Sequence, residues 1–244
     1  MIKGSFPIIA CSIKSNGEPK RYRCPQAEGE LFEISQTQLK REVTQIDSVI
    51  SQAIEQIQAA ANRKSGLSGL TSGFTELDKL TSGWQNSDLI IIAARPAMGK
   101  TAFVLSMIKR MAVDHGIPCA MFSLEMSNQQ LVQRLMVNVS ELSGEKLRSG
   151  QLAPYEWGQL DKRVRQLYNA PIYIDDTPSL SVFELQTKAR RLVREFGVKI
   201  IMIDYLQLMK ASGLNINSRQ EEVSAVSRAL KALAKELNIP IIAL

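Results

Sequence analysis

The chain has 244 residues, of which 45% are hydrophobic and 22% are charged. This balance is typical of a globular domain with one sizeable core, and it excludes collagen-like, disordered and purely coiled-coil proteins. The longest apolar runs, residues 89–94 and 200–203, are far shorter than the roughly 20 residues that a membrane-spanning helix needs. The apolar start of the chain is broken by Pro7 and lacks a small-residue cleavage site, so we expect no signal peptide and a cytoplasmic protein.

Charge and cysteine content restrict the possible partners. The net charge is +6, from 30 Lys and Arg against 24 Asp and Glu, and residues 1–25 alone contribute five cations and one acid. The rest of the chain is therefore nearly neutral, and charge alone leaves binding to a polyanion undecided. Three cysteines without a C-x-x-C pair and a single histidine, His115, make neither a disulfide framework nor a four-ligand zinc site.

The first 65 residues divide into two zones by composition. Residues 1–28 mix prolines and charges without a helical or strand period, so we leave them unassigned. Residues 29–65 are predicted to hold two helices, a shorter one over residues 31–41 and a longer one that ends near residue 62. Apolar residues recur on one face of the longer helix at Ile46, Val49, Ile50, Ala53, Ile54, Ile57 and Ala61. Amphipathicity alone leaves open whether this face packs on its own domain or on a partner.

Residues 66–244 are predicted to form one α/β domain. Glycines in residues 66–84 indicate turns around a short helix near residues 77–80. The predicted strands that follow are residues 89–94, 118–124, 172–175, 199–204 and 239–244. The predicted helices between them are residues 101–113, 128–139, 154–168, 182–196 and 219–237. Continuous apolar strands separated by helices indicate a mostly parallel sheet flanked by helices on both faces.

The strongest chemical signal lies between the first of these strands and the helix after it. Residues 94–101 read A-R-P-A-M-G-K-T and match the phosphate-binding pattern G-x-x-x-x-G-K-[ST], except that Ala94 replaces the first glycine. Gly99 lets the backbone approach phosphate oxygens, Lys100 reaches the β and γ phosphates, and Thr101 offers a hydroxyl to Mg²⁺. The predicted nucleotide-binding residues are Ala94, Arg95, Pro96, Ala97, Met98, Gly99, Lys100, Thr101 and Ala102.

Two carboxylates are candidates for holding the metal and activating water. Asp204 ends an apolar strand, at the edge where parallel sheets place their ligands, so we predict that it completes the Mg²⁺ site. Tyr205 follows it where many related enzymes have a glutamate, so the catalytic base must come from elsewhere. Glu125 is the best source: if its strand lies beside the phosphate-loop strand, Glu125 emerges at the same edge as Lys100 and Asp204.

Alternatives to Glu125 remain open on the residues alone. Glu125 could be only a favourable charge at the start of a helix. Asp175 and Asp176 are rival carboxylates, but adjacent strand residues point to opposite faces, so we interpret that pair as structural.

Two further groups of charges have uncertain roles. The cations crowded on the predicted helix 182–196 are best explained as a solvated helix face. The polar segment from Lys210 to Arg219 is either a DNA-contacting loop or an ordinary connection.

Several stretches together match one known family. They are SGFTELDKLTSGW, ARPAMGKT, FSLEMS, APIYIDDTPSLS, IIMIDYLQLM and SRQEEVSAVSRALKALAKEL. With them, residues 29–244 resemble the ATPase domain and linker of the DnaB-type replicative DNA helicases. The resemblance implies a RecA-like P-loop NTPase core over residues 66–244 and a linker over residues 29–65. It implies that Lys100 and Thr101 bind ATP and Mg²⁺, that Asp204 holds the metal and that Glu125 activates water.

The resemblance also implies an activity and partners. A complete member would hydrolyse ATP, move 5′ to 3′ on single-stranded DNA and unwind the duplex as a homohexamer, with a primase and a helicase loader as partners and no membrane. Residues 1–28 match no part of the family, and the family continues beyond the position of Leu244. We therefore expect this chain to bind ATP weakly and not to unwind DNA. Another RecA-like ATPase or a non-enzymatic nucleotide-binding module is the alternative.

Overall fold

The computed structural model describes residues 46–47, 50–51, 54–55, 58, 66–209 and 218–244. The chain divides into two compact units, residues 1–53 and 54–244, and the fold described below belongs to the second. The described residues between 46 and 58 are helical. The predicted helix over residues 31–41 and the unassigned residues 1–28 lie outside the described residues, so the boundaries at residues 28 and 65 stay predictions.

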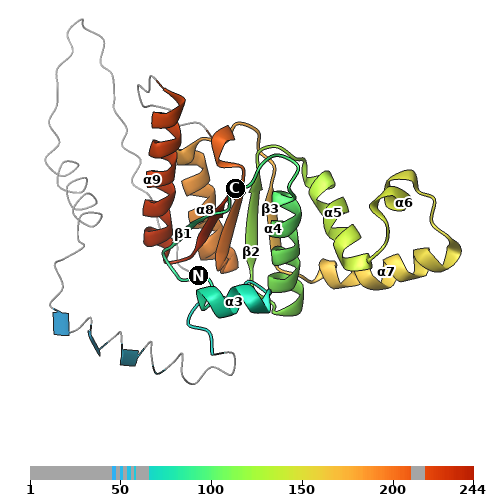
Figure 1. Ribbon diagram of the computed structural model, residues 1–244, viewed down its shortest axis with the longest axis horizontal. Coiled ribbons are helices and arrows are strands. Elements are labelled where there is room, and N and C mark those ends of the chain that lie inside the picture. The colour runs from blue at the N-terminus through green and yellow to red at the C-terminus, as the bar shows by residue number, and fades with distance from the viewer. Residues whose placement is uncertain (1–45, 48–49, 52–53, 56–57, 59–65, 210–217) are drawn as a thin grey trace, which may run out of the picture. The chain divides into compact units, whose positions relative to one another are not determined.

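A five-stranded parallel sheet forms the centre of the second unit (Figure 1). In chain order the strands are β1 Leu89–Ile91, β2 Cys119–Ser123, β3 Ile172–Asp175, β4 Ile200–Asp204 and β5 Ile241–Ala243. Their spatial order is β1-β5-β4-β2-β3, and each neighbouring pair is parallel. The carboxyl ends of all five strands therefore lie at one edge. One premise of the sequence analysis was wrong, because β5 and β4 separate β2 from the phosphate-loop strand β1.

Seven α-helices are described within residues 66–244. They are α3 Thr75–Thr81, α4 Lys100–Lys109, α5 Asn128–Ser140, α6 Gly144–Ser149, α7 Pro154–Tyr168, α8 Val182–Phe196 and α9 Arg219–Leu237. A π-helical turn, Arg110–Asp114, continues α4, and a 3-10 turn, Leu206–Leu208, follows β4. Serine side chains cap α5, α8 and α9 by accepting backbone N–H groups of the first turn. No helix in the described part of the chain is both long and apolar enough to cross a bilayer.

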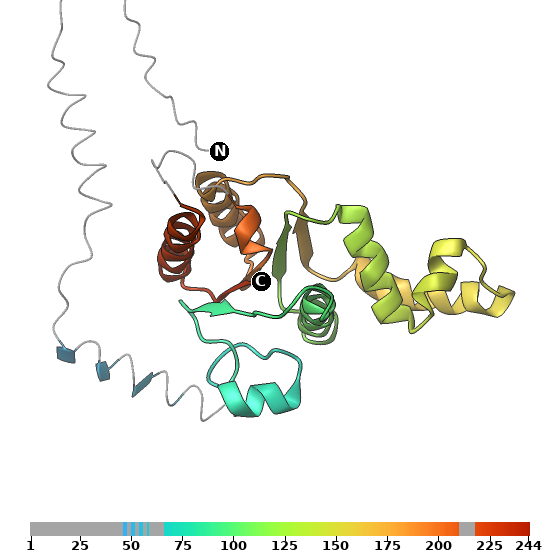
Figure 2. The same cartoon turned by 45° about the horizontal axis from the view of Figure 1, so that its top comes forward.

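The core has two layers, one on each face of the sheet. Alternate residues of β4 serve opposite layers: Ile201 and Ile203 pack with α8 and α9, while Ile200 and Met202 pack with α4 and α5. Figure 2 shows α8 and α9 together on one side of the strands and α4 on the other. Both views show α6 and α7 projecting beyond α5, away from the sheet. The carboxyl edge of the sheet is left for the loops that carry the predicted site.

Candidate functional site

The phosphate loop joins β1 to α4 at the carboxyl edge of the sheet. Its residues from 93 to 99 are exposed. Ala97 and Gly99 have φ values of 63° and 86°, so the loop passes twice through the left-handed region. In this structure Gly99 is required for its φ and not for space, since a Cβ built on it would meet no atom within 4 Å.

Lys100 is the first residue of α4 and folds back over the loop. Its Nζ donates a hydrogen bond to the backbone oxygen of Ala94 at 2.8 Å. Ala94 is the residue that departs from the phosphate-binding pattern, and the group it contributes is a carbonyl that any amino acid supplies. The first N–H groups of α4 have no acceptor within the helix, so they and the ammonium present donors at the same loop.

Thr101 and Asp204 are brought into direct contact although they lie far apart in the sequence. The Thr101 Oγ1 hydroxyl donates to Asp204 Oδ2 at 2.7 Å, and the Asp204 residue is only 2% exposed. Asp204 is the last residue of β4, so the sheet edge fixes its carboxylate under the start of α4. These two oxygen groups form the donor set that Mg²⁺ prefers, so the residues present fit this metal.

Glu125 lies in the turn that follows β2, at the same edge. Its residue is exposed, and the N–H of the preceding Leu124 donates to the backbone oxygen of Asp204 at 2.7 Å. The base candidate is therefore tied by the main chain to the metal-ligand candidate on the neighbouring strand. Sequence reasoning missed Ser123, whose buried hydroxyl closes this turn; a lone serine at the end of a strand has no periodic signal that marks it.

The neighbouring carboxylates of Asp175 and Asp176 have separate structural partners. Asp175 Oδ2 pairs with Lys188 Nζ at 2.8 Å, and its Oδ1 accepts the N–H of Thr177 at 3.0 Å. Burial acts to raise the pKa of Asp175, but the hydrogen bonds from Lys188 and Thr177 outweigh it and hold that pKa below its usual range. Asp176 instead accepts two hydrogen bonds from Asn128 at the start of α5, each of 2.9 Å.

The cations of α8 are paired with acids, as a solvated structural face would be. Arg190 pairs with Glu236 of α9 at 2.6 Å, and Arg191 pairs with Glu195 at 2.8 Å. Lys210 and the loop up to residue 217 lie outside the described residues. Arg219 is described as the first residue of α9, where it pairs with Glu222.

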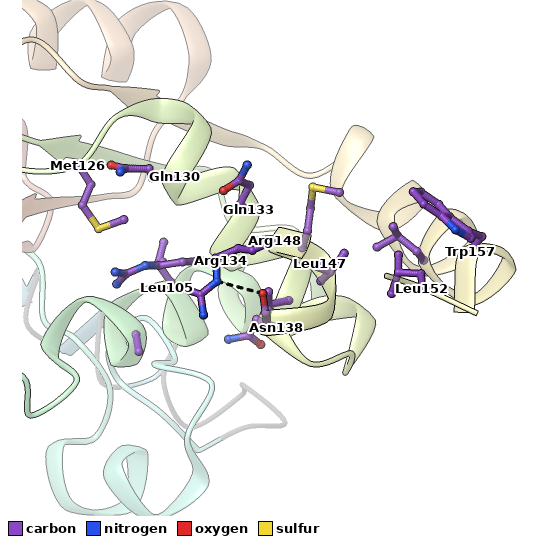
Figure 3. A pocket seen from close by; sticks show the side chains of 15 residues that line it. Leu105, Met126, Gln130, Gln133, Arg134, Asn138, Leu147, Arg148, Leu152 and Trp157 are labelled. Atoms are coloured by element: carbon purple, nitrogen blue, oxygen red, sulfur yellow. Dashed lines mark hydrogen bonds between the residues drawn. The ribbon is translucent and has the colours of Figure 1, made fainter. Parts of the chain in front are cut away.

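A second feature is an apolar groove of about 790 Å³ between α4, α5, α6 and α7 (Figure 3). Figure 3 shows Met126 at one end of the groove and Leu152 and Trp157 at the other. Trp157 is 54% exposed. Arg134 and Arg148 also line the groove, and within the described residues neither forms an ion pair with an acid. The groove therefore offers apolar walls and two available positive charges.

Comparisons with known proteins identify the family. Residues 69–244 match the DnaB-like helicase C terminal domain. The chain belongs to this family. It is 46% identical over 219 residues to the replicative DNA helicase DnaB of Geobacillus stearothermophilus and 43% identical over 219 residues to the replicative DNA helicase DnaC of Bacillus subtilis. Each alignment covers 90% of this chain and 48% of the relative, so the chain spans about half the length of these relatives.

Two solved structures share the fold. One is described as an ATPase domain, with a TM-score of 0.77, 36% identity and coverage of 83% of this chain and 71% of that one. The other is described as a DnaB-like replicative helicase and its interactions with primase, with a TM-score of 0.74, 34% identity and coverage of 90% and 51%. The predicted RecA-like core of the DnaB-type helicases is confirmed.

Proposed function

We propose that this chain is the ATP-hydrolysing part of a replicative DNA helicase, which in its complete form moves 5′ to 3′ on single-stranded DNA and unwinds the duplex in the cytoplasm. The Thr101–Asp204 contact at the carboxyl edge of the sheet carries this proposal. It joins the phosphate loop to the apolar strand that ends in a carboxylate, and that junction is what binding of a metal–triphosphate complex needs. Membership of the family supports the same conclusion.

In this proposal Lys100, Thr101 and Asp204 bind the nucleotide and its metal. The Lys100 ammonium exchanges the carbonyl of Ala94 for phosphate oxygens, and the N–H groups at the start of α4 hold the remaining phosphate charge. The Thr101 hydroxyl and the Asp204 carboxylate would hold Mg²⁺. When bound, Mg²⁺ neutralises charge on the β and γ phosphates.

Glu125 acts as the base that orients and deprotonates the attacking water. Within the described residues its carboxylate has no hydrogen-bond or ion-pair partner, so it is available to water. Tyr205 follows Asp204 directly and has no carboxylate, so the strand of the metal ligand cannot supply the base. Glu125 lies on the strand next to it, tied to Asp204 through Leu124.

The test is ATP hydrolysis by the purified chain with and without single-stranded DNA. Turnover that rises with DNA and disappears in Lys100→Ala supports the helicase ATPase. Turnover that ignores DNA supports another RecA-like ATPase, and nucleotide binding without turnover supports a non-enzymatic module. A strand-displacement assay on the same sample measures unwinding, which we expect to be absent from this chain alone.

We also propose that copies of the chain associate through the groove, as in the homohexamer that the family resemblance implies. Ile46, Ile50 and Ile54 lie one turn apart in a helix and are 69%, 49% and 50% exposed. Residues 42–62 contain three acids and no Lys or Arg. An apolar, acidic helix of a second copy therefore complements an apolar groove that holds two arginines.

Light scattering of the purified chain tests this association. Ile50→Glu and Trp157→Glu should each shift the chain toward the monomer, because each puts a charge on an apolar contact. Tyr168→Glu is the matched control, since Tyr168 is an exposed aromatic residue of α7 that does not line this groove. We propose single-stranded DNA, a primase and a helicase loader as partners of the complete protein; the interaction of a related helicase with primase supports one of them.

A further inference from the structure

The position of the Glu125 carboxylate depends on the backbone turn that carries it. Ser123, the last residue of β2, is 1% exposed. Its Oγ donates to the backbone oxygen of Met126 at 2.8 Å and accepts the N–H of Met126 at 3.1 Å. One buried hydroxyl thus satisfies both backbone groups of Met126 and closes the turn around Glu125.

The far end of the same segment is held by a different element. Asp176, just after β3, accepts the backbone N–H of Asn128 at 2.9 Å and the Asn128 side-chain Nδ2 at 2.9 Å. The helix itself does not require this contact as a cap. Ser127 and Gln130 already form a complete capping box at the start of α5. Asp176 therefore adds a link between β3 and the Glu125 segment beyond what the helix end needs.

We propose that Ser123 and Asp176 are positioning residues that hold Glu125 at its working distance from the nucleotide site. This inference rests on the proposed function, in which Glu125 activates water. A general base must lie within about 3 Å of the proton it takes, and a shift of about 1 Å can cost 100-fold in rate. An exposed carboxylate with no side-chain partner keeps that distance only if its backbone is fixed, and these two residues fix it.

The first experiment compares two buried serines of the full chain. Ser140 is also fully buried, and its Oγ accepts the N–H of Leu142 at 3.4 Å, but it lies at the opposite end of α5. We expect Ser123→Ala to lower kcat for ATP about tenfold or more while the Kd for ATP changes less than about twofold. Ser140→Ala should leave kcat near the parent value, and Ser123→Thr, which keeps the hydroxyl, should recover most of the loss.

The second experiment compares two neighbouring carboxylates at the surface, where misfolding is a smaller concern. Asp176→Asn puts an amide group against the donors of Asn128 and should lower kcat severalfold without changing the Kd for ATP. Asp175→Asn alters the pair with Lys188 instead and should leave kcat unchanged.

A double variant separates positioning from general structural damage. If Ser123 acts through Glu125, adding Ser123→Ala to Glu125→Gln should not lower the residual rate further. Additive losses would overturn the inference, as would parental kcat in Ser123→Ala or an equal loss in Ser140→Ala. A parent chain that hydrolyses no ATP would refute the proposed function and this inference with it, whereas an active parent with an unaffected Ser123→Ala would refute the inference alone.

Discussion

Two parts of the sheet edge are built in different ways. On the phosphate-loop side, Thr101 and Asp204 touch through their side chains at 2.7 Å, and Asp204 is buried. On the side of β2, Glu125 is exposed, and its position comes from main-chain contacts of the residues around it. The first part is assembled before any ligand arrives, and the second provides a free carboxylate on a fixed turn.

The difference has an electrostatic reason. A buried carboxylate is costly without compensating charge, and one hydroxyl donor is a modest counterpart to the Asp204 oxygens. Such a group favours a cation beside it. Glu125 must instead keep its oxygens available to water, which an exposed position allows. Binding and hydrolysis should therefore be separable by mutation.

The largest effect is expected for Glu125→Gln. Loss of the base should lower kcat about 10²- to 10⁴-fold, because proton transfer from water is what a positioned carboxylate contributes. The Kd for ATP, measured by titration with a fluorescent analogue, should stay within about twofold of the parent, since no phosphate contact is lost. Hydrolysis at the parent rate would assign the base to another residue.

Lys100→Ala should act on the other side of the comparison. Loss of one charged donor to the phosphates should weaken ATP binding by about tenfold to 100-fold. The same titration measures it, and an unchanged melting temperature confirms that α4 still forms. Normal affinity in this variant would contradict the phosphate-loop assignment.

Asp204→Asn should remove the contribution of Mg²⁺ to ATP binding. The parent should bind ATP about tenfold more tightly with Mg²⁺ than with a chelator, and the variant should show no such difference. Asp88→Asn is the matched control, because Asp88 pairs with Lys231 at the opposite edge of the sheet. Equal Mg²⁺ dependence in Asp204→Asn and the parent would remove Asp204 from the metal site.

Much of the fold could be predicted from local pattern. The predicted bounds of β3, α7, α8 and α9 agree with the structure, because apolar periodicity, serine caps and Pro154 mark their ends. α6 was missed, since six residues are too few to show a helical period. The order of the strands was also beyond the sequence, because it depends on which apolar strands share a layer and each strand reads alike.

The site was predicted in part. Lys100, Thr101 and Asp204 follow from motif and strand-end position, and the structure brings them together. The premise that placed Glu125 near them was wrong, since β2 borders β4 and not β1. The expected edge still holds, because parallel strands present all their carboxyl ends at one side. Ser123 was missed because its role is a contact with the backbone of Met126, which residue type alone does not reveal.

The smallest effect concerns Asp175, whose contrast with Asp176 sharpens the comparison between fold and turn. The pKa of Asp175 is held below its usual range because Lys188 and Thr177 outweigh burial. A carboxyl with a lowered folded-state pKa adds stability above its ordinary pKa of about 3.9, and this stability is lost as the pH falls below that value. Because the pair with Lys188 is partly exposed, the contribution should stay below about 1 kcal/mol.

Urea unfolding at several pH values measures this contribution. The difference in unfolding free energy between the parent and Asp175→Asn should be constant from about pH 5 to pH 8 and should shrink as the pH falls below about 4. If Asp175 serves only the fold, kcat for ATP should be equal in the parent and the variant at neutral pH. A loss of kcat in Asp175→Asn as large as that in Asp176→Asn would show that both carboxylates act on the Glu125 turn, and the division between them would fail.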